Sequence, residues 1–263
     1  MIKTQNSKLK SQKCGKNLIK NQKSKLLKLC AFVPLCLCAF LLARFAYPID
    51  LVNIPNAETL KKGDLSLSFR IYDNGGLVMN SGLGLSNNVF VGVPLDMQNA
   101  IGDEKIETSL PLLLFLKVKC TSGNEKIPSI SLGYYDPYGY KKRWEGKRIK
   151  GLKGLYLVAT KPIILFDLKH NLSFGFLVDV EDYEKGGFSL FSGTELALGG
   201  KFILLAEVES IPIDSGSENK KAGFNLGTKF LLAENLDLSI CAIDLFGGNP
   251  SRIVKIGYKI KVF

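Results

Sequence analysis

Short segments in which apolar and polar residues alternate with a period of two dominate the chain after residue 50. In residues 64–72, Leu65, Leu67, Phe69 and Ile71 fall on one face and mostly polar residues fall on the other. This pattern predicts β-strands with one apolar and one polar face. We predict about twelve strands (10–14), at residues 64–72, 76–86, 88–96, 109–119, 127–135, 152–160, 171–181, 187–198, 201–211, 222–232, 235–244 and 252–263.

Two architectures have such faces, a soluble sandwich or small barrel and a membrane-spanning barrel. The predicted strands are mostly 8–11 residues long, close to the ~9–11 that cross a bilayer when tilted. Short and long connections also alternate, as they do in outer-membrane barrels. The short ones include 86–88, 199–200 and 233–235, and the long ones include 97–108, 136–151 and 212–221. Exceptions are 120–126 and 161–170, which are unexpectedly long, and 73–75, which is unexpectedly short.

The start of the chain has the layout of a secretory signal peptide. Nine lysines in the first 28 residues precede an uncharged, mostly apolar run at 29–43. We predict a signal peptide with a long basic region at 1–46, a periplasmic entry segment at 47–63 and a barrel at 64–263. The alternative is an uncleaved N-terminal anchor, although a transmembrane helix needs ~20 apolar residues.

With its leader, its alternating strands and its last residue Phe263, the chain resembles small, porin-like bacterial outer-membrane β-barrel proteins. The stretch 54–63 is similar to the entry segment of uncharacterised porin-like families. The resemblance implies an all-β, up-and-down antiparallel transmembrane β-barrel in the bacterial outer membrane. It also implies lipid contact and assembly by the outer-membrane insertion machinery.

The net charge of +11 does not indicate a nucleic-acid partner. Residues 1–49 hold ten Lys and Arg and no acid, which leaves 35 − 10 = 25 bases against 24 acids in the rest. Catalytic chemistry is also poorly supported. The one histidine, His170, is predicted in a turn, although a hydrolase pair with Ser173 is an alternative. We predict no enzyme activity, no cofactor and no metal, and no disulfide between Cys120 and Cys241.

Alternation predicts two groups of opposite charge on the inner wall of the barrel. The predicted basic arc is Arg70, Lys117, Lys119, Lys229, Lys255, Lys259 and Lys261. The predicted acidic arc is Asp179, Glu181, Glu195, Glu207 and Glu209. Opposed walls of this kind can orient polar solutes in a narrow lumen. Alternatively, the charges pair and close the lumen.

The predicted extracellular connection between 127–135 and 152–160 is rich in bases and aromatics. It carries Tyr138, Tyr140, Lys141, Lys142, Arg143, Trp144, Lys147 and Arg148. Such residues can bind lipopolysaccharide phosphates and sugars, or serve as a solvated loop with interfacial anchors.

The sequence favours a narrow porin-like channel for small polar solutes. Two alternatives remain open: a structural or surface-polysaccharide-associated barrel with a plugged lumen, and a secreted soluble β-barrel that binds a ligand. The oligomeric state is not predicted.

Overall fold

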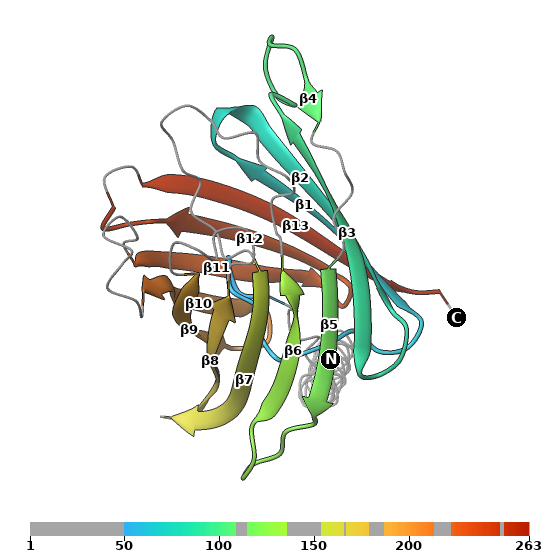
Figure 1. The fold of residues 1–263 in the computed structure, drawn as a ribbon, viewed down its shortest axis with the longest axis vertical. Helices are drawn as coiled ribbons and strands as arrows, with labels where there is room; N and C mark the ends of the chain where they lie inside the picture. The colour runs from blue at the N-terminus through green and yellow to red at the C-terminus, as the bar shows by residue number, and fades with distance from the viewer. Residues whose placement is uncertain are drawn as a thin grey trace, which may run out of the picture. The chain divides into compact units, whose positions relative to one another are not determined.

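The computed structural model describes residues 50–108, 115–135, 154–165, 167–178, 187–212, 222–247 and 250–262. In these residues the strands form one antiparallel sheet that closes on itself (Figure 1). The order runs from β2 through β1 and β13 down to β5 and β3, and β3 pairs with β2. Twelve strands make the closed wall, and β4 is a short addition to the edge of β3. The predicted fold class is confirmed.

The strands of the wall are β1 (Asp64–Tyr72), β2 (Gly76–Gly84), β3 (Val89–Gln98), β5 (Phe115–Thr121), β6 (Ser129–Tyr135), β7 (Gly154–Leu165), β8 (Leu168–Val178), β9 (Phe188–Leu198), β10 (Phe202–Pro212), β11 (Gly223–Ala233), β12 (Leu236–Ile243) and β13 (Ser251–Lys261). The extra strand β4 spans Glu107–Thr108, and a 3-10 turn, η1 (Asp73–Gly75), joins β1 to β2. Each predicted strand overlaps one strand of the wall.

The pairing of Asp64 with Lys261 places the start of β1 and the end of β13 at the same end of the barrel. The connections between β2 and β3, β7 and β8, β9 and β10, and β11 and β12 are short turns at this end. The prediction of a long connection at 161–170 was wrong. Here β7 continues to Leu165 and β8 begins at Leu168, and Pro162 on β7 pairs with Asn171 on β8. The connection after β5 remains longer, at 122–128.

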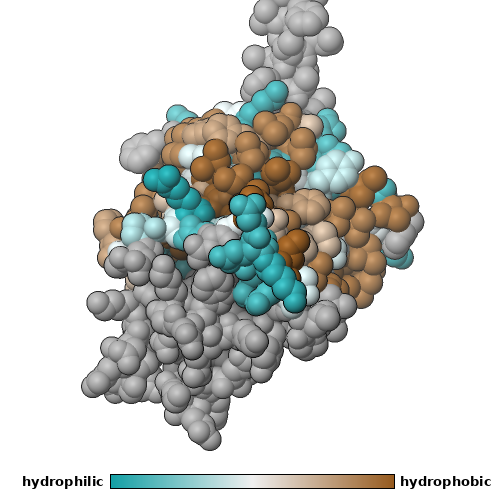
Figure 2. Space-filling model, turned by 90° about the horizontal axis from the view of Figure 1, so that it is seen from above, coloured by the Kyte–Doolittle hydropathy of each residue, from teal (hydrophilic) through white to brown (hydrophobic). Residues whose placement is uncertain are grey.

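The outer surface of the barrel is apolar. Alternate residues of the strands expose large hydrophobic side chains, including Leu132, Leu155, Leu172, Phe174, Phe176, Leu226, Phe230, Ile240, Ile256 and Ile260. Figure 2 shows hydrophobic residues over much of the barrel's visible surface. The residues between them point inward and are largely polar, as with the buried Ser131, Thr160 and Ser173. A closed barrel that is apolar outside and polar inside has the surface of a membrane-spanning β-barrel.

The described residues contain no helix long and apolar enough to cross a membrane.

The outward position of Phe174 gives a test of the lipid-facing surface. Phe174 lies near the middle of β8 and is 53% exposed. We expect Phe174→Arg to destabilise the folded barrel by about 2–4 kcal/mol, because it places a charge in the hydrocarbon region. Urea titrations of folding into lipid vesicles measure this change. The control is Ile127→Arg, whose site is 54% exposed but lies in the turn between β5 and β6. Equal losses in both variants would contradict a lipid-facing β8.

Candidate functional site in the barrel interior

Residues 50–60, named here the lumenal segment, lie inside the barrel. This part of the predicted entry segment runs between opposite walls, as Figure 1 shows for the blue trace at the start of the coloured chain. Its residues contact inward side chains of strands all around the wall, namely β1, β5, β6, β7, β10 and β13. Leu51, Val52, Ile54 and Ala57 are at most 3% exposed. The segment therefore occupies the middle of the lumen.

A single carboxylate holds the turn at the tip of the lumenal segment. The oxygens of Glu207 on β10 accept hydrogen bonds from the backbone N–H groups of Val52 at 3.0 Å, Asn53 at 2.8 Å and Ile54 at 3.2 Å. A fourth bond comes from the side-chain amide of Asn225 on β11 at 2.6 Å. Charged acceptors make hydrogen bonds about twice as strong as neutral ones. Glu207 is thus the main anchor of the turn.

Asn53 connects the acidic wall to the basic wall. Its amide nitrogen donates to Glu209 Oε1 at 3.1 Å, and its amide oxygen accepts from Arg70 on β1. Arg70 also donates to the backbone carbonyl of Val52. Asn53, Arg70 and Glu209 are all buried. One side chain of the lumenal segment therefore lies between the two predicted arcs.

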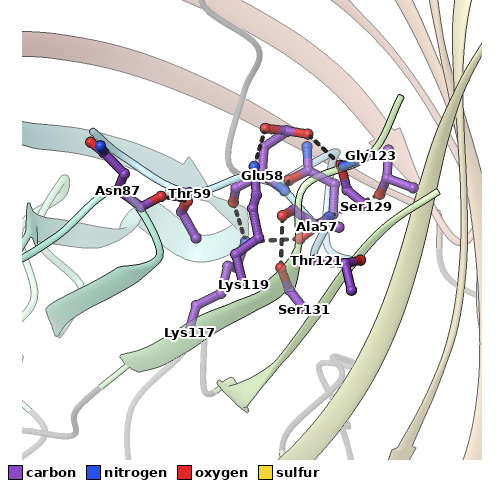
Figure 3. A network of polar contacts seen from close by, with 12 residues as sticks. Ala57, Glu58, Thr59, Asn87, Lys117, Lys119, Thr121, Gly123, Ser129 and Ser131 are labelled. Atoms are coloured by element: carbon purple, nitrogen blue, oxygen red, sulfur yellow. Dashed lines mark hydrogen bonds and ion pairs between the residues drawn. The ribbon is translucent and has the colours of Figure 1, made fainter. Parts of the chain in front are cut away.

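A second set of contacts holds the other end of the lumenal segment against β5 and β6 (Figure 3). Lys117 Nζ donates to the carbonyl oxygens of Asn56 at 2.9 Å and Glu58 at 3.1 Å. The carboxylate of Glu58 lies 2.7 Å from Lys119 Nζ. Ser131 donates to the carbonyl of Ala57 at 2.7 Å. Backbone and side-chain groups of the segment are satisfied by the wall, as buried polar groups require.

Two inward glycines make room for the lumenal segment and for Lys61, which follows it. A Cβ at Gly193 on β9 would lie 2.5 Å from Leu51 Cδ2 and 2.7 Å from Ile54 Cδ1. A Cβ at Gly84 on β2 would lie 2.0 Å from the carbonyl oxygen of Lys61. All three distances are shorter than atoms in contact allow. The wall is shaped to receive this segment.

Apolar contacts add to the polar anchors. Leu51, Ile54 and Ala57 pack with inward side chains of β7, β8 and β9, which include Tyr156 and Phe191. Val52 packs in a second cluster with Ile203, Leu205, Cys241, Ile243 and Ile253. Burial of apolar side chains contributes about 25 cal/mol per Å². The segment is therefore docked by both polar and apolar contacts.

The lumenal segment does not fill the barrel completely. One small cavity, open on one side, is lined by residues of β1, β2, β3, β5, β6, β7 and β13 together with Asp50. A second is lined by Asp50 and by residues of β1, β11, β12 and β13. Lys255 and Asp50 border both cavities. Space lined by both polar and apolar groups therefore remains beside the segment, on the side of β1 and β13.

Most residues of the predicted arcs point into the barrel. Arg70, Lys117, Lys229, Glu195, Glu207 and Glu209 are buried, and Lys119, Lys255 and Lys259 are partly buried. Lys261 differs, because it is exposed as the last residue of β13. The two groups do not face each other across an open lumen, since the lumenal segment lies between them. Asp179 and Glu181 lie outside the described residues.

Other predicted candidates are separated by the fold. A turn was predicted at His170, but this residue lies within β8. It is three residues from Ser173, so alternation puts the two side chains on opposite faces of the strand. Ser173 instead shares a hydrogen bond of 2.9 Å with Thr160. Both cysteines of the described chain are free, Cys120 exposed on β5 and Cys241 buried on β12.

The basic and aromatic loop falls outside the described residues. This holds for Tyr138, Tyr140, Lys141, Lys142, Arg143, Trp144, Lys147 and Arg148.

Sequence reasoning missed the role of the lumenal segment. One signal lay in residues 51–60 themselves, where Asn53 and Asn56 interrupt apolar residues without any strand or helix period. A second lay on β10, where Glu207 and Glu209 share the inward face and need partners when buried. Neither signal identifies its partner, because Asn53 and Glu207 are 154 residues apart.

Comparisons with known proteins give structural resemblances at low sequence identity. No family model matches the chain, and no curated protein matches it. A KdgM porin structure aligns with a TM-score of 0.45 and 9% identity, over 74% of this chain and 97% of that chain. The Acinetobacter baumannii outer membrane protein Omp33 aligns with a TM-score of 0.42 and 8% identity, over 75% and 96%. A mutant of the Rh. blastica porin aligns with a TM-score of 0.30 and 10% identity, over 75% and 98%.

The strand pairing and the apolar exterior define the class of protein. The chain is a transmembrane β-barrel, the architecture of bacterial outer-membrane proteins.

Proposed function

We propose that this chain is a porin-like channel for small polar solutes, narrowed from inside by the lumenal segment. The observation that carries the proposal is the space left beside residues 50–60, bordered in part by charged and hydroxyl side chains, in a barrel whose exterior suits lipid. A barrel of eight strands is filled by its own side chains, and one of 16–18 strands leaves an aqueous channel. Twelve strands lie between these sizes, so an additional chain segment can narrow the lumen without filling it.

The geometry supports a channel better than it supports a wholly structural barrel. A wholly structural barrel would have its lumen closed, either by packed side chains or by paired charges, with no space left beside the segment. Here the cavities beside the segment are bordered by charged and hydroxyl groups, among them Lys255, Ser66 and Ser68. Polar walls of this kind carry hydrated ions and small solutes. We propose no enzymatic activity for the chain.

Planar-bilayer recording with the purified full-length protein tests the channel. We expect discrete conductance steps in potassium chloride, small because the lumenal segment occupies the centre. Protein with heat-modifiable mobility on a gel is the required starting material, since this property shows that the barrel is folded. Folded protein that gives no steps at any voltage would contradict the proposal and favour a plugged structural barrel.

The orientation and the outer contacts follow from the same proposal. The end with the start of β1, the end of β13 and the short turns faces the periplasm, and the long connections face the cell exterior. The basic and aromatic loop at 136–151 would then meet lipopolysaccharide, through bonds from its bases to phosphates.

A further inference from the structure

Asp50 lies where four lysine side chains converge. Its carboxylate is 2.6 Å from Lys255 Nζ. Lys117 borders the first of the two cavities that Asp50 lines, and Lys229 and Lys259 border the second. The acids that border these cavities are Asp50 and Asp237. Four bases against two acids leave an excess of positive charge at this place. Without Asp50, that excess would grow by one unit.

The ammonium group of Lys229 interacts with the carboxylates of Asp50 and Glu195 through charge and not through a direct bond. Lys229 is 2% exposed on β11. In the described part of the chain no residue forms a hydrogen bond or a salt bridge with it. A buried charge that no acceptor bonds directly is less well stabilised than a bonded one. This lysine therefore favours the arrival of a mobile anion in the adjoining cavity.

Asp50 itself behaves as an anion bound to this site. Burial alone would raise the pKa of its carboxyl, but the charges of Lys255, Lys229 and Lys117 outweigh burial and hold the pKa below its usual value. Asp50 is also the first described residue of the lumenal segment, joined to the wall by its side chain and to Pro55 by a backbone bridge. Its carboxylate is attached to a segment and not to the barrel wall.

We propose that the lysines around Asp50 form a binding site for small carboxylates, and that Asp50 occupies it in competition with the solute. A solute carboxylate takes the place of the Asp50 carboxylate on Lys255 and gains the charge of Lys229. The site thereby selects anionic solutes during passage and loosens one end of the lumenal segment. This inference rests on the proposed channel, because the solute reaches the site through the lumen.

Calorimetric titration of the folded barrel in detergent with malonate tests the site without requiring conduction. Asp50→Ala removes the internal competitor, and we expect malonate to bind about tenfold more tightly than to the unmodified protein. Adding Lys229→Met to Asp50→Ala is expected to abolish that gain. The matched control is Asp73→Ala, an exposed acid in η1 that is expected to leave malonate binding unchanged. Malonamide, which is uncharged, is expected not to bind to any variant.

Asp50→Asn shows whether a change in malonate affinity comes from a folding defect, because it keeps the size of the side chain and removes only its charge. It is expected to change malonate affinity in the same direction as Asp50→Ala. The proposed site would be contradicted if malonate bound neither variant more tightly than it binds the unmodified protein. It would also be contradicted if malonate bound no more tightly than malonamide. Bilayer recordings separate this result from failure of the channel. Conducting protein without the gain in affinity refutes only the site, and binding by non-conducting protein refutes only the channel.

Discussion

Deletion of residues 51–58 is expected to raise the single-channel conductance several-fold while the barrel wall stays folded. These residues lie in the middle of the lumen, and their removal leaves inward side chains such as Arg70, Lys117 and Glu207 facing water. Pairing between neighbouring strands is unaffected, because backbone bonds within the wall do not involve the segment. Planar-bilayer recording measures the change, and heat-modifiable mobility confirms folding.

Two further variants test whether the lumenal segment itself limits the conductance. Gly193→Phe is expected to raise conductance too, because its side chain takes the space of Leu51 and Ile54. Deletion of residues 102–105, which are exposed in the connection after β3, is the control and should leave conductance unchanged. A conductance unaltered by removing 51–58 would show that the segment does not limit the pore.

The second large effect is expected from Glu207→Ala. This change removes the acceptor of three backbone N–H groups at the tip of the lumenal segment. Each buried donor left without a partner costs about 1–3 kcal/mol, so the docked position of the tip should lose several kcal/mol. Hydrogen–deuterium exchange with mass spectrometry reads this directly, as loss of protection at the amides of residues 52–54.

Glu195→Ala is the matched control for Glu207→Ala. Glu195 is a buried acid on the neighbouring strand β9, and its bond is to Asn171 of the wall. We expect Glu195→Ala to keep residues 52–54 protected. Protection retained in Glu207→Ala, or lost equally in both variants, would contradict the anchoring role of Glu207.

The wall of the barrel was predictable because period two is a local signal. The segment 64–72 shows it clearly, with Phe69 and Ile71 outside and Arg70 inside. The signal fails where alternation stops. Residues 163–165 are three consecutive apolar residues after Pro162, so the hairpin of β7 and β8 read as a long connection.

The interior was predictable only in part. Alternation predicts an inward direction for Lys117 and Glu207 from their positions along one strand, and both side chains are buried. It does not say what lies opposite them. The hydrogen bond from Lys117 to the carbonyl of Asn56 joins residues 61 positions apart, and no periodic pattern in the sequence indicates it. The lumenal segment was therefore taken as an entry segment, and opposed charges appeared to face an open lumen.

The reactivity of a cysteine at position 54 tests most directly whether the lumenal segment lies inside the barrel. Ile54 is 0% exposed. In a background with the six native cysteines replaced by alanine, Ile54→Cys is expected to resist a bulky, water-soluble maleimide in the folded barrel. It should react readily after heat denaturation. Ile127→Cys, in the exposed turn after β5, should react in both states. Labelling of position 54 in the folded barrel as fast as position 127 would contradict the inward placement of residues 50–60.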